Sequence, residues 1–332
     1  MTKFWAGLGF TAAILSAVSS YPAAAADKVN FMNGWLPGGD YGVPYYAVQK
    51  GYFAAEGLDV TVMPSRGSSD VLTKIATGTA DVGLAGLAAL LQAKAESDLP
   101  VSALAAIYPE QPDSIFTTEG SGIRTLKDLE GKKVATATFT SSNVVWPLML
   151  DRNGINASKI TLQKVDPTAL PALLATGQVD ATINWTTAAP SFDTALKDAK
   201  KKLVVIRWTD FGFEGYGLSL VAADKMIKER PEILRKVVKV YIKALELANK
   251  DPEGVAAALK AMVPEIDVKV AEAQFRTTMP LVDNPTTKAE GIGTITDKRL
   301  AATWEWTAKS QNIAMNKINP ESAINRSFMP KK

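Results

Sequence analysis

The stretch Ile75-Ala-Thr-Gly-Thr-Ala-Asp-Val-Gly-Leu-Ala-Gly86 has an echo 99 positions later, from 75 to 174, in Leu174-Ala-Thr-Gly-Gln-Val-Asp-Ala-Thr-Ile-Asn-Trp185. In both copies a helix is predicted to end on a glycine, because glycine tolerates the left-handed conformation common at helix ends. A turn carrying an aspartate and a short strand follow. A single copy of this pattern is common in α/β proteins, so only its repetition is informative.

The repeat extends backward along the chain. Before the first copy, strands are predicted at 29–32 and 58–63, with a helix between them. Before the second copy, strands are predicted at 133–137 and 160–165, again with a helix between them. Two similar β-α-β-α-β units predict two similar lobes. The alternation of strands and helices predicts parallel strands with crossover helices in each lobe.

Two segments without regular structure are predicted to link the lobes. Tyr108–Asp113 contains two prolines, and Asp210–Gly217 contains three glycines in eight residues. We therefore predict an α/β fold in which residues 27–110 and 217–332 form the first lobe and residues 111–216 form the second. The chain after the second linking segment is predicted to be mostly helical.

Composition excludes several classes of function. The formal charge of the 332 residues is only +3, with no basic stripe, so we expect no nucleic-acid partner. The chain has no histidine and no cysteine. Ser-His-Asp and Cys-His catalysis and zinc sites built on these residues are therefore excluded. Catalysis by paired carboxylates stays open, because Asp40, Asp70 and Glu214 could converge. We expect no enzyme activity, no metal and no cofactor.

The N-terminus predicts export. Residues 1–26 have the pattern of a signal peptide: Lys3, an apolar run from Phe4 to Val18, and a small-residue cleavage site at Ala24-Ala25-Ala26. A retained N-terminal anchor is the rival interpretation. Without cysteine the mature protein cannot be a lipoprotein, so we expect a free monomer in a bacterial periplasm.

Three motifs carry a resemblance to a known family: Lys50-Gly-Tyr-Phe-Ala-Ala-Glu-Gly-Leu-Asp-Val60, Gly67-Ser-Ser-Asp70 and Ala76-Thr-Gly-Thr-Ala-Asp-Val-Gly83. With them the mature chain resembles the nitrate/sulfonate/taurine group of ABC-transporter solute-binding proteins, including the binders of thiamine-pyrimidine precursors. The resemblance implies a type II periplasmic-binding-protein fold, each lobe a mixed sheet flanked by helices, with two hinge passages. It also implies a small-molecule solute, handed to an ABC permease in the inner membrane. Pyrimidine-forming enzymes related to this group use a histidine and a cysteine-rich motif, which this chain lacks.

The candidate ligand site lies in the loops that follow the strands of both lobes. Ligands of open α/β sheets bind at the carboxyl ends of the strands. The expected ligand-binding residues are Trp35, Asp40, Tyr41, Arg66, Ser68, Ser69, Asp70, Gly86, Thr138, Thr140, Ser141, Ser142, Asn143, Asn184, Trp185, Thr186, Glu214 and Tyr216. Several of the serines and asparagines are also good helix N-caps, and the two roles are compatible.

Aromatic and acidic side chains at these strand ends indicate the class of solute. Trp35 and Trp185 can stack on a planar ring. Arg66 is the one cation among these loops, against several carboxylates, which suit amino or ring N–H donors. We hypothesise a planar, nitrogen-containing aromatic solute such as a thiamine-pyrimidine precursor. An aromatic carboxylate, an alkanesulfonate or taurine is the alternative that Arg66 favours. A ligand sensor that presents itself to a receptor is a further alternative.

Overall fold

The computed structural model describes residues 1–2 and 25–329. Most of the predicted signal peptide therefore lies outside the described residues. Within 1–2 and 25–329, no helix is both long enough and apolar enough to cross a membrane.

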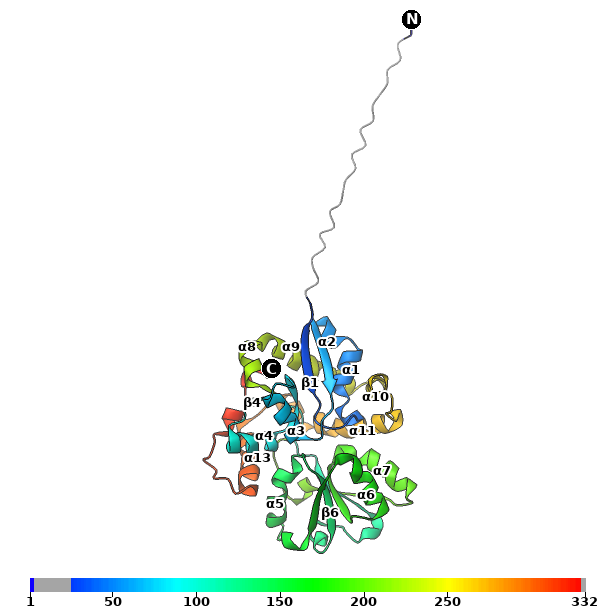
Figure 1. Cartoon of the computed structure of the whole chain (residues 1–332), viewed down its shortest axis with the longest axis vertical. Helices are drawn as coiled ribbons and strands as arrows, with labels where there is room; N and C mark the ends of the chain where they lie inside the picture. The colour runs from blue at the N-terminus through cyan, green and yellow to red at the C-terminus, as the bar shows by residue number, and fades with distance from the viewer. Residues whose placement is uncertain (3–24, 330–332) are drawn as a thin grey trace.

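The chain forms two lobes, each built on one five-stranded sheet (Figure 1). In spatial order, the first sheet consists of β2 (Leu58–Met63), β1 (Asp27–Met32), β3 (Val82–Gly86), β10 (Leu218–Ala223) and β4 (Val101–Ala106). The second consists of β7 (Thr161–Val165), β6 (Lys133–Ala137), β8 (Ala181–Trp185), β5 (Asp113–Thr118) and β9 (Leu203–Arg207). The order β2-β1-β3 in one sheet matches β7-β6-β8 in the other, so the sequence repeat is a repeat of structure.

The repeated aspartate has the same structural role in both lobes. The backbone N–H of Asn30 donates to Asp81 Oδ2 at 2.8 Å, and the backbone N–H of Lys133 donates to Asp180 Oδ2, also at 2.8 Å. Each aspartate thus ties the turn after a helix to the central strand of its module. Gly78 and Gly177, at the preceding helix ends, have φ of +77° and +75°, which glycine adopts without strain.

Both sheets are mixed. The three strands of each repeat are parallel, but β10 is antiparallel to β3 and β4, and β5 is antiparallel to β8 and β9. These two strands bring the chain into each sheet from the other lobe. The sequence pattern predicted the parallel modules; the mixed character of the sheets came from the family resemblance and is confirmed.

Helices cover the faces of both sheets (Figure 1). In the first lobe they are α1 (Val43–Gln49), α2 (Tyr52–Ala55), α3 (Ser68–Ala76), α4 (Leu87–Ser97), α8 (Asp224–Glu229), α9 (Pro231–Ala248), α10 (Pro252–Met262), α11 (Val268–Val282) and α12 (Pro285–Glu290). In the second they are α5 (Ser142–Arg152), α6 (Leu170–Thr176) and α7 (Ala189–Asp198). Helix α9 buries the stripe of apolar residues predicted for it, including Val237, Val240 and Leu245.

The chain crosses between the lobes after β4 and again after β9, at the two passages predicted as hinges. The last long helix, α13 (Asp297–Ser310), adds a further connection, because it packs against both α4 and α5. The backbone N–H of Leu148 donates to Ser310 Oγ at 3.1 Å, and Arg152 pairs with Glu305 at 2.9 Å. The C-terminal segment therefore contacts the second lobe as well as the first.

Candidate functional site

A pocket lies between the lobes, at the carboxyl ends of β1, β2, β6 and β8. We call it the Trp pocket. The pocket is lined by Gly34, Trp35, Asp40, Tyr41, Ser68, Thr140, Ile183, Asn184, Trp185, Thr187 and Ala188. Seven of these were predicted from the sequence. Both sheets therefore contribute their strand-end loops to one space, as the switch-point rule requires.

Aromatic rings from both lobes face each other across the pocket. Trp185 stacks on Tyr41 with ring centroids 6.5 Å apart and an angle of 21° between the planes. It also meets Tyr108 at 6.1 Å. Trp35, at the loop after β1, packs against the apolar clusters of both lobes. Trp35, Tyr41 and Trp185 are thus the three aromatic residues among the eleven that line the Trp pocket, and their rings favour planar ligands.

One carboxylate lines the pocket. Asp40 lies in the short 3-10 helix Gly39–Tyr41, and its Oδ2 accepts a hydrogen bond from the Thr187 hydroxyl of the second lobe at 2.9 Å. Burial raises the pKa of Asp40 from 3.8 to about 7, although the hydrogen bond from Thr187 opposes the shift. Asp40 therefore changes charge near neutral pH, in contact with the opposite lobe.

The raised pKa of Asp40 predicts a pH-dependent stability. The folded, closed protein holds this proton more tightly than the unfolded chain does, so the stabilisation is complete below about pH 4 and is lost as pH rises toward 7. Between pH 5.5 and 7.5 the free energy of unfolding of the wild type should fall by about 1 to 2 kcal/mol relative to Asp40→Asn. Thermal unfolding of both proteins across this range measures the difference. Parallel pH profiles would contradict it.

A second buried carboxylate, Asp113, holds Trp185 in place. The indole Nε1 of Trp185 donates to Asp113 Oδ1 at 3.2 Å. Burial raises the pKa of Asp113 to about 6, while hydrogen bonds from Ser142 and Trp185 oppose the rise. Asp113 begins β5, directly after the first hinge passage, so it links the hinge to an aromatic wall of the pocket.

The cleft is closed and narrow in this conformation. The cavity volume of the Trp pocket is about 30 Å³. A water molecule requires roughly 10 to 15 Å³ of cavity volume, and a cavity of about 150 Å³ admits benzene. The pocket thus has space for about two waters and none for an aromatic ring. Any ring that binds here requires the lobes to separate or the aromatic walls to move.

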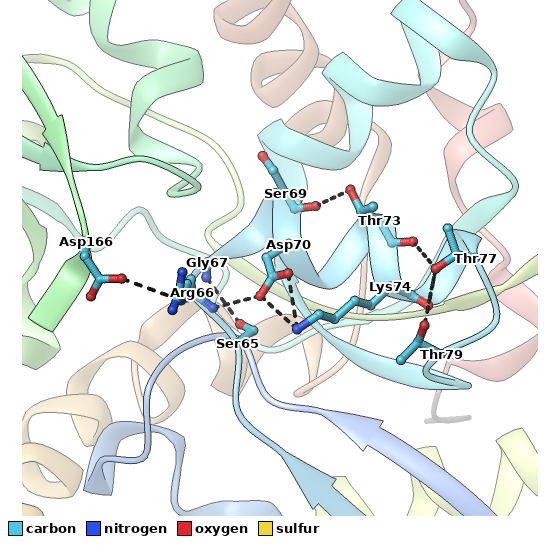
Figure 2. A network of polar contacts seen from close by, with 10 residues as sticks. All are labelled: Ser65, Arg66, Gly67, Ser69, Asp70, Thr73, Lys74, Thr77, Thr79 and Asp166. Carbon is cyan, nitrogen blue, oxygen red and sulfur yellow. Dashed lines mark hydrogen bonds and ion pairs between the residues drawn. The ribbon is translucent and has the colours of Figure 1, made fainter.

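Arg66 is not among the residues that line the pocket, and Figure 2 shows its side chain directed toward Asp166. Its Nε is 3.5 Å from Asp166 Oδ2 of the second lobe, and both side chains are largely exposed. Asp70, in the first turn of α3, accepts from the backbone N–H of Arg66 at 3.0 Å and pairs with Lys74, so it ties the preceding loop to the helix. The backbone N–H of Ser69 donates to the carbonyl of Phe139 across the cleft at 3.1 Å. These three predicted residues fix loops or connect the lobes and do not line the pocket.

Ser68 and Thr140 line the pocket, and the predicted residues next to them fix the surrounding loops. Ser68 Oγ accepts from the backbone N–H of Gly86 at 2.9 Å, and Gly86 lies against Ser141 of the second lobe. The hydroxyls of Thr140 and Ser142 are 3.1 Å apart. Asn143 and Thr138 bond to backbone carbonyls at the ends of β6 and β7, so they fix loops there.

The last three predicted residues lie elsewhere. Thr186 follows Trp185 and donates its backbone N–H to Pro112 at 2.8 Å. Glu214 is exposed at a separate hollow beside α13. Tyr216 is buried, and its hydroxyl accepts from the backbone N–H of Thr296 at 2.8 Å. The three carboxylates considered for catalysis therefore lie in different places: Asp40 in the Trp pocket, Asp70 in the first turn of α3, and Glu214 at the hollow beside α13.

Sequence reasoning missed Gly34, Ile183, Thr187, Ala188 and the supporting Asp113. The last two lining residues continue the loop after β8, which was followed only as far as Thr186. Asp113 had one signal, because it is the acidic residue at the end of the first linking segment, Tyr108–Asp113. Among residues 1–2 and 25–329, no group of three or more acidic, histidine or cysteine side chains is placed to hold a metal ion.

Residues 40–255 match the family described as NMT1/THI5 like. The riboflavin-binding protein RibY of Chloroflexus aurantiacus is 23% identical over 91% of this chain and 86% of its own length. The 4-amino-5-hydroxymethyl-2-methylpyrimidine phosphate synthase THI11 of Saccharomyces cerevisiae is 35% identical, but over only 33% of this chain and 32% of its own.

Solved structures of solute-binding proteins have the same fold. The alkanesulfonate-binding protein SsuA of Xanthomonas axonopodis pv. citri, bound to MOPS, aligns with a TM-score of 0.72 and 18% identity over 92% of this chain and 100% of its own. The periplasmic aliphatic sulphonate-binding protein SsuA of Escherichia coli aligns with a TM-score of 0.68 and 18% identity over 91% and 92%. At these identities the likeness establishes the periplasmic-binding-protein fold.

Proposed function

The chain belongs to the NMT1/THI5-like family, and from this premise we propose that it is the periplasmic solute-binding component of an ABC importer. It captures a planar, nitrogen-containing aromatic solute between its lobes and delivers it to the permease. The observation that carries the ligand class is the make-up of the Trp pocket: two tryptophans, one tyrosine, and Asp40 as its one charged residue among those described.

The charge of the pocket favours solutes with N–H donors. With a pKa of about 7, the Asp40 carboxylate is half ionised near neutral pH. A hydrogen bond from an amino or ring N–H group of the solute stabilises the anionic form of Asp40. An anionic solute instead requires Asp40 to be protonated. Binding of an aminopyrimidine should therefore release a proton near pH 7, and binding of a sulfonate should take one up.

The neighbouring sulfonate-binding structures favour a second candidate, an alkanesulfonate, taurine or an aromatic carboxylate. Arg66 is the residue that would serve such an anion. Its ion pair with Asp166 bridges the lobes at an exposed rim, where such pairs contribute about 0 to 1 kcal/mol. Arg66 is thus already paired with a carboxylate, so it would stabilise a bound anionic solute less strongly than an unpaired arginine would.

Calorimetric titration of the mature protein decides between these ligands. The panel is 4-amino-5-hydroxymethyl-2-methylpyrimidine, riboflavin, taurine, MOPS and benzoate, in two buffers of different ionisation enthalpy. We expect binding of a nitrogen heteroaromatic compound with proton release, and Arg66→Gln should change its affinity by less than about threefold, since an exposed pair is weak. Binding of the anions alone, lost in Arg66→Gln, would contradict the proposal and support the second candidate.

Transport, rather than catalysis or sensing, is the role that the fold neighbours support. The yeast relatives are named as synthases, but the chain spans about a third of their length and contains neither histidine nor cysteine. The proposed cycle is closure of the two lobes around the solute by bending at the two passages. Location in the periplasm, a monomeric state and lobe boundaries at 27–110, 111–216 and 217–332 belong to this proposal.

A further inference from the structure

A second hollow adjoins the Trp pocket. We call it the Phe192 chamber. It shares four wall residues with the Trp pocket: Trp35, Asp40, Asn184 and Ala188. The two spaces are therefore neighbours separated by these side chains. The other walls come from the loop after Trp35, from the start of α6, from α7 and from α11.

The chamber is large enough for a ring, whereas the Trp pocket is not. Its cavity volume is about 200 Å³, against about 30 Å³ for the Trp pocket. Since a cavity of about 150 Å³ admits benzene, only the chamber holds a ring without further opening of the lobes. A solute held by this closed form must therefore place much of its volume in the chamber.

The walls of the chamber define what it accepts. Leu36, Pro167, Pro171 and Phe192 supply apolar surface. The side-chain Oε1 of Gln274 accepts a hydrogen bond from the backbone N–H of Gly39. Its Nε2 group can therefore donate a hydrogen bond to a solute. No lysine or arginine lines the chamber, and Asp40 is its one charged wall residue among those described. A phosphate or sulfonate would enter without a cation to neutralise it.

We propose that the solute has two parts, a planar nitrogen-containing ring and a neutral or cationic substituent. The ring lies beside Trp35, and the larger of the two parts occupies the Phe192 chamber. The inference rests on the proposed function and narrows its ligand class to extended, unphosphorylated compounds. Trp35 and Asp40, which border both spaces, contact the solute where its two parts join.

Ser191 of α7 offers a way to fill the chamber. Its side chain lines the chamber but not the Trp pocket, and its hydroxyl donates only to the carbonyl of Ala188 at 2.8 Å. Ser191→Leu adds volume inside the chamber. Ser191→Ala removes the hydroxyl without filling the space and is the matched control.

The test compares affinities for a small and an extended form of the solute. The probes are 4-amino-5-hydroxymethyl-2-methylpyrimidine as the single ring, thiamine and riboflavin as extended compounds, and thiamine monophosphate and FMN as their phosphorylated counterparts. We expect thiamine or riboflavin to bind at least tenfold more tightly than the single ring and than its own phosphate ester. Ser191→Leu should weaken the extended compound at least tenfold and the single ring less than threefold. Ser191→Ala should change neither by more than threefold.

Several outcomes would overturn this inference and leave the proposed function intact. They are tighter binding of the single ring than of both extended compounds, equal affinity for the phosphate esters, or an equal loss for both solute sizes in Ser191→Leu. If the wild type bound none of the heteroaromatic probes but bound taurine or MOPS, both the proposed ligand class and the two-part solute would fall.

Discussion

Replacing Gly86 with alanine should prevent full closure of the lobes and weaken solute binding at least tenfold, or about 1.4 kcal/mol. A Cβ at Gly86 would lie 2.5 Å from Ser141 Oγ and 2.6 Å from Ser141 Cβ, which belong to the other lobe. Contacts this short are not tolerated, so the lobes must move apart. The backbone of Gly86 is extended, with φ of −65°, so alanine adds no backbone strain. Within the first lobe its Cβ would lie 3.3 Å from Ser68 Oγ, a much smaller overlap than that with Ser141.

Two controls separate this effect from damage to the fold. Gly120→Ala adds the same methyl group where nothing lies within 4 Å, and it should leave affinity unchanged. Ser141→Gly in the Gly86→Ala background removes the opposing atoms and should restore binding. Small-angle scattering with and without solute reports closure. Normal compaction of Gly86→Ala on adding solute would contradict the prediction.

Replacing Trp35 with alanine should also weaken binding at least tenfold. Trp35 borders both the Trp pocket and the Phe192 chamber, so its ring faces the solute under either account of the solute's size. Calorimetric titration measures the loss. Trp35→Phe keeps an aromatic face and should retain affinity within about threefold, whereas Trp35→Leu keeps bulk without the face and should behave like alanine. Equal affinity in the leucine and phenylalanine variants would refute stacking.

From the sequence, stability without solute should be little changed by losing Trp35 or Trp185. The structure changes this expectation. Trp35 packs against the apolar clusters of both lobes, and Trp185 packs on Tyr41 and donates to the buried Asp113. Removal of either side chain should therefore lower the melting temperature as well. Trp35 is the better probe of binding, because its loss leaves no buried carboxylate without its donor.

The fold could be predicted because its signals are local and repeated. The glycines and aspartates of the two copies, Gly78 with Asp81 and Gly177 with Asp180, fix the same turn in each lobe. Trp35 follows the strand predicted at 29–32, and Trp185 ends the second copy of the repeat. Because parallel strands end at one edge, Trp35 and Trp185 were expected at one cleft, and both line the Trp pocket.

The roles of individual polar residues could not be predicted, because they depend on tertiary partners. Arg66 and Asp70 are strand-end residues of the expected type, but Asp70 binds the backbone N–H of Arg66 and Arg66 pairs with Asp166. The position of Tyr216 is set by α13, some 80 residues farther along the chain, through its bond to Thr296. The contact of α13 with the second lobe has no local signal, because a buried helical stripe does not indicate which element it packs against.

In the proposed function, a planar nitrogen-containing solute is held at Trp35, between two lobes that meet at Asp40 and Thr187. A crystal structure of the mature protein grown with its tightest-binding heteroaromatic solute tests this most directly. We expect the ring against Trp35 with an N–H group on the Asp40 carboxylate. A ring bound elsewhere, or a cleft in which Asp40 faces an anionic group and Arg66 turns inward to meet it, would contradict the claim.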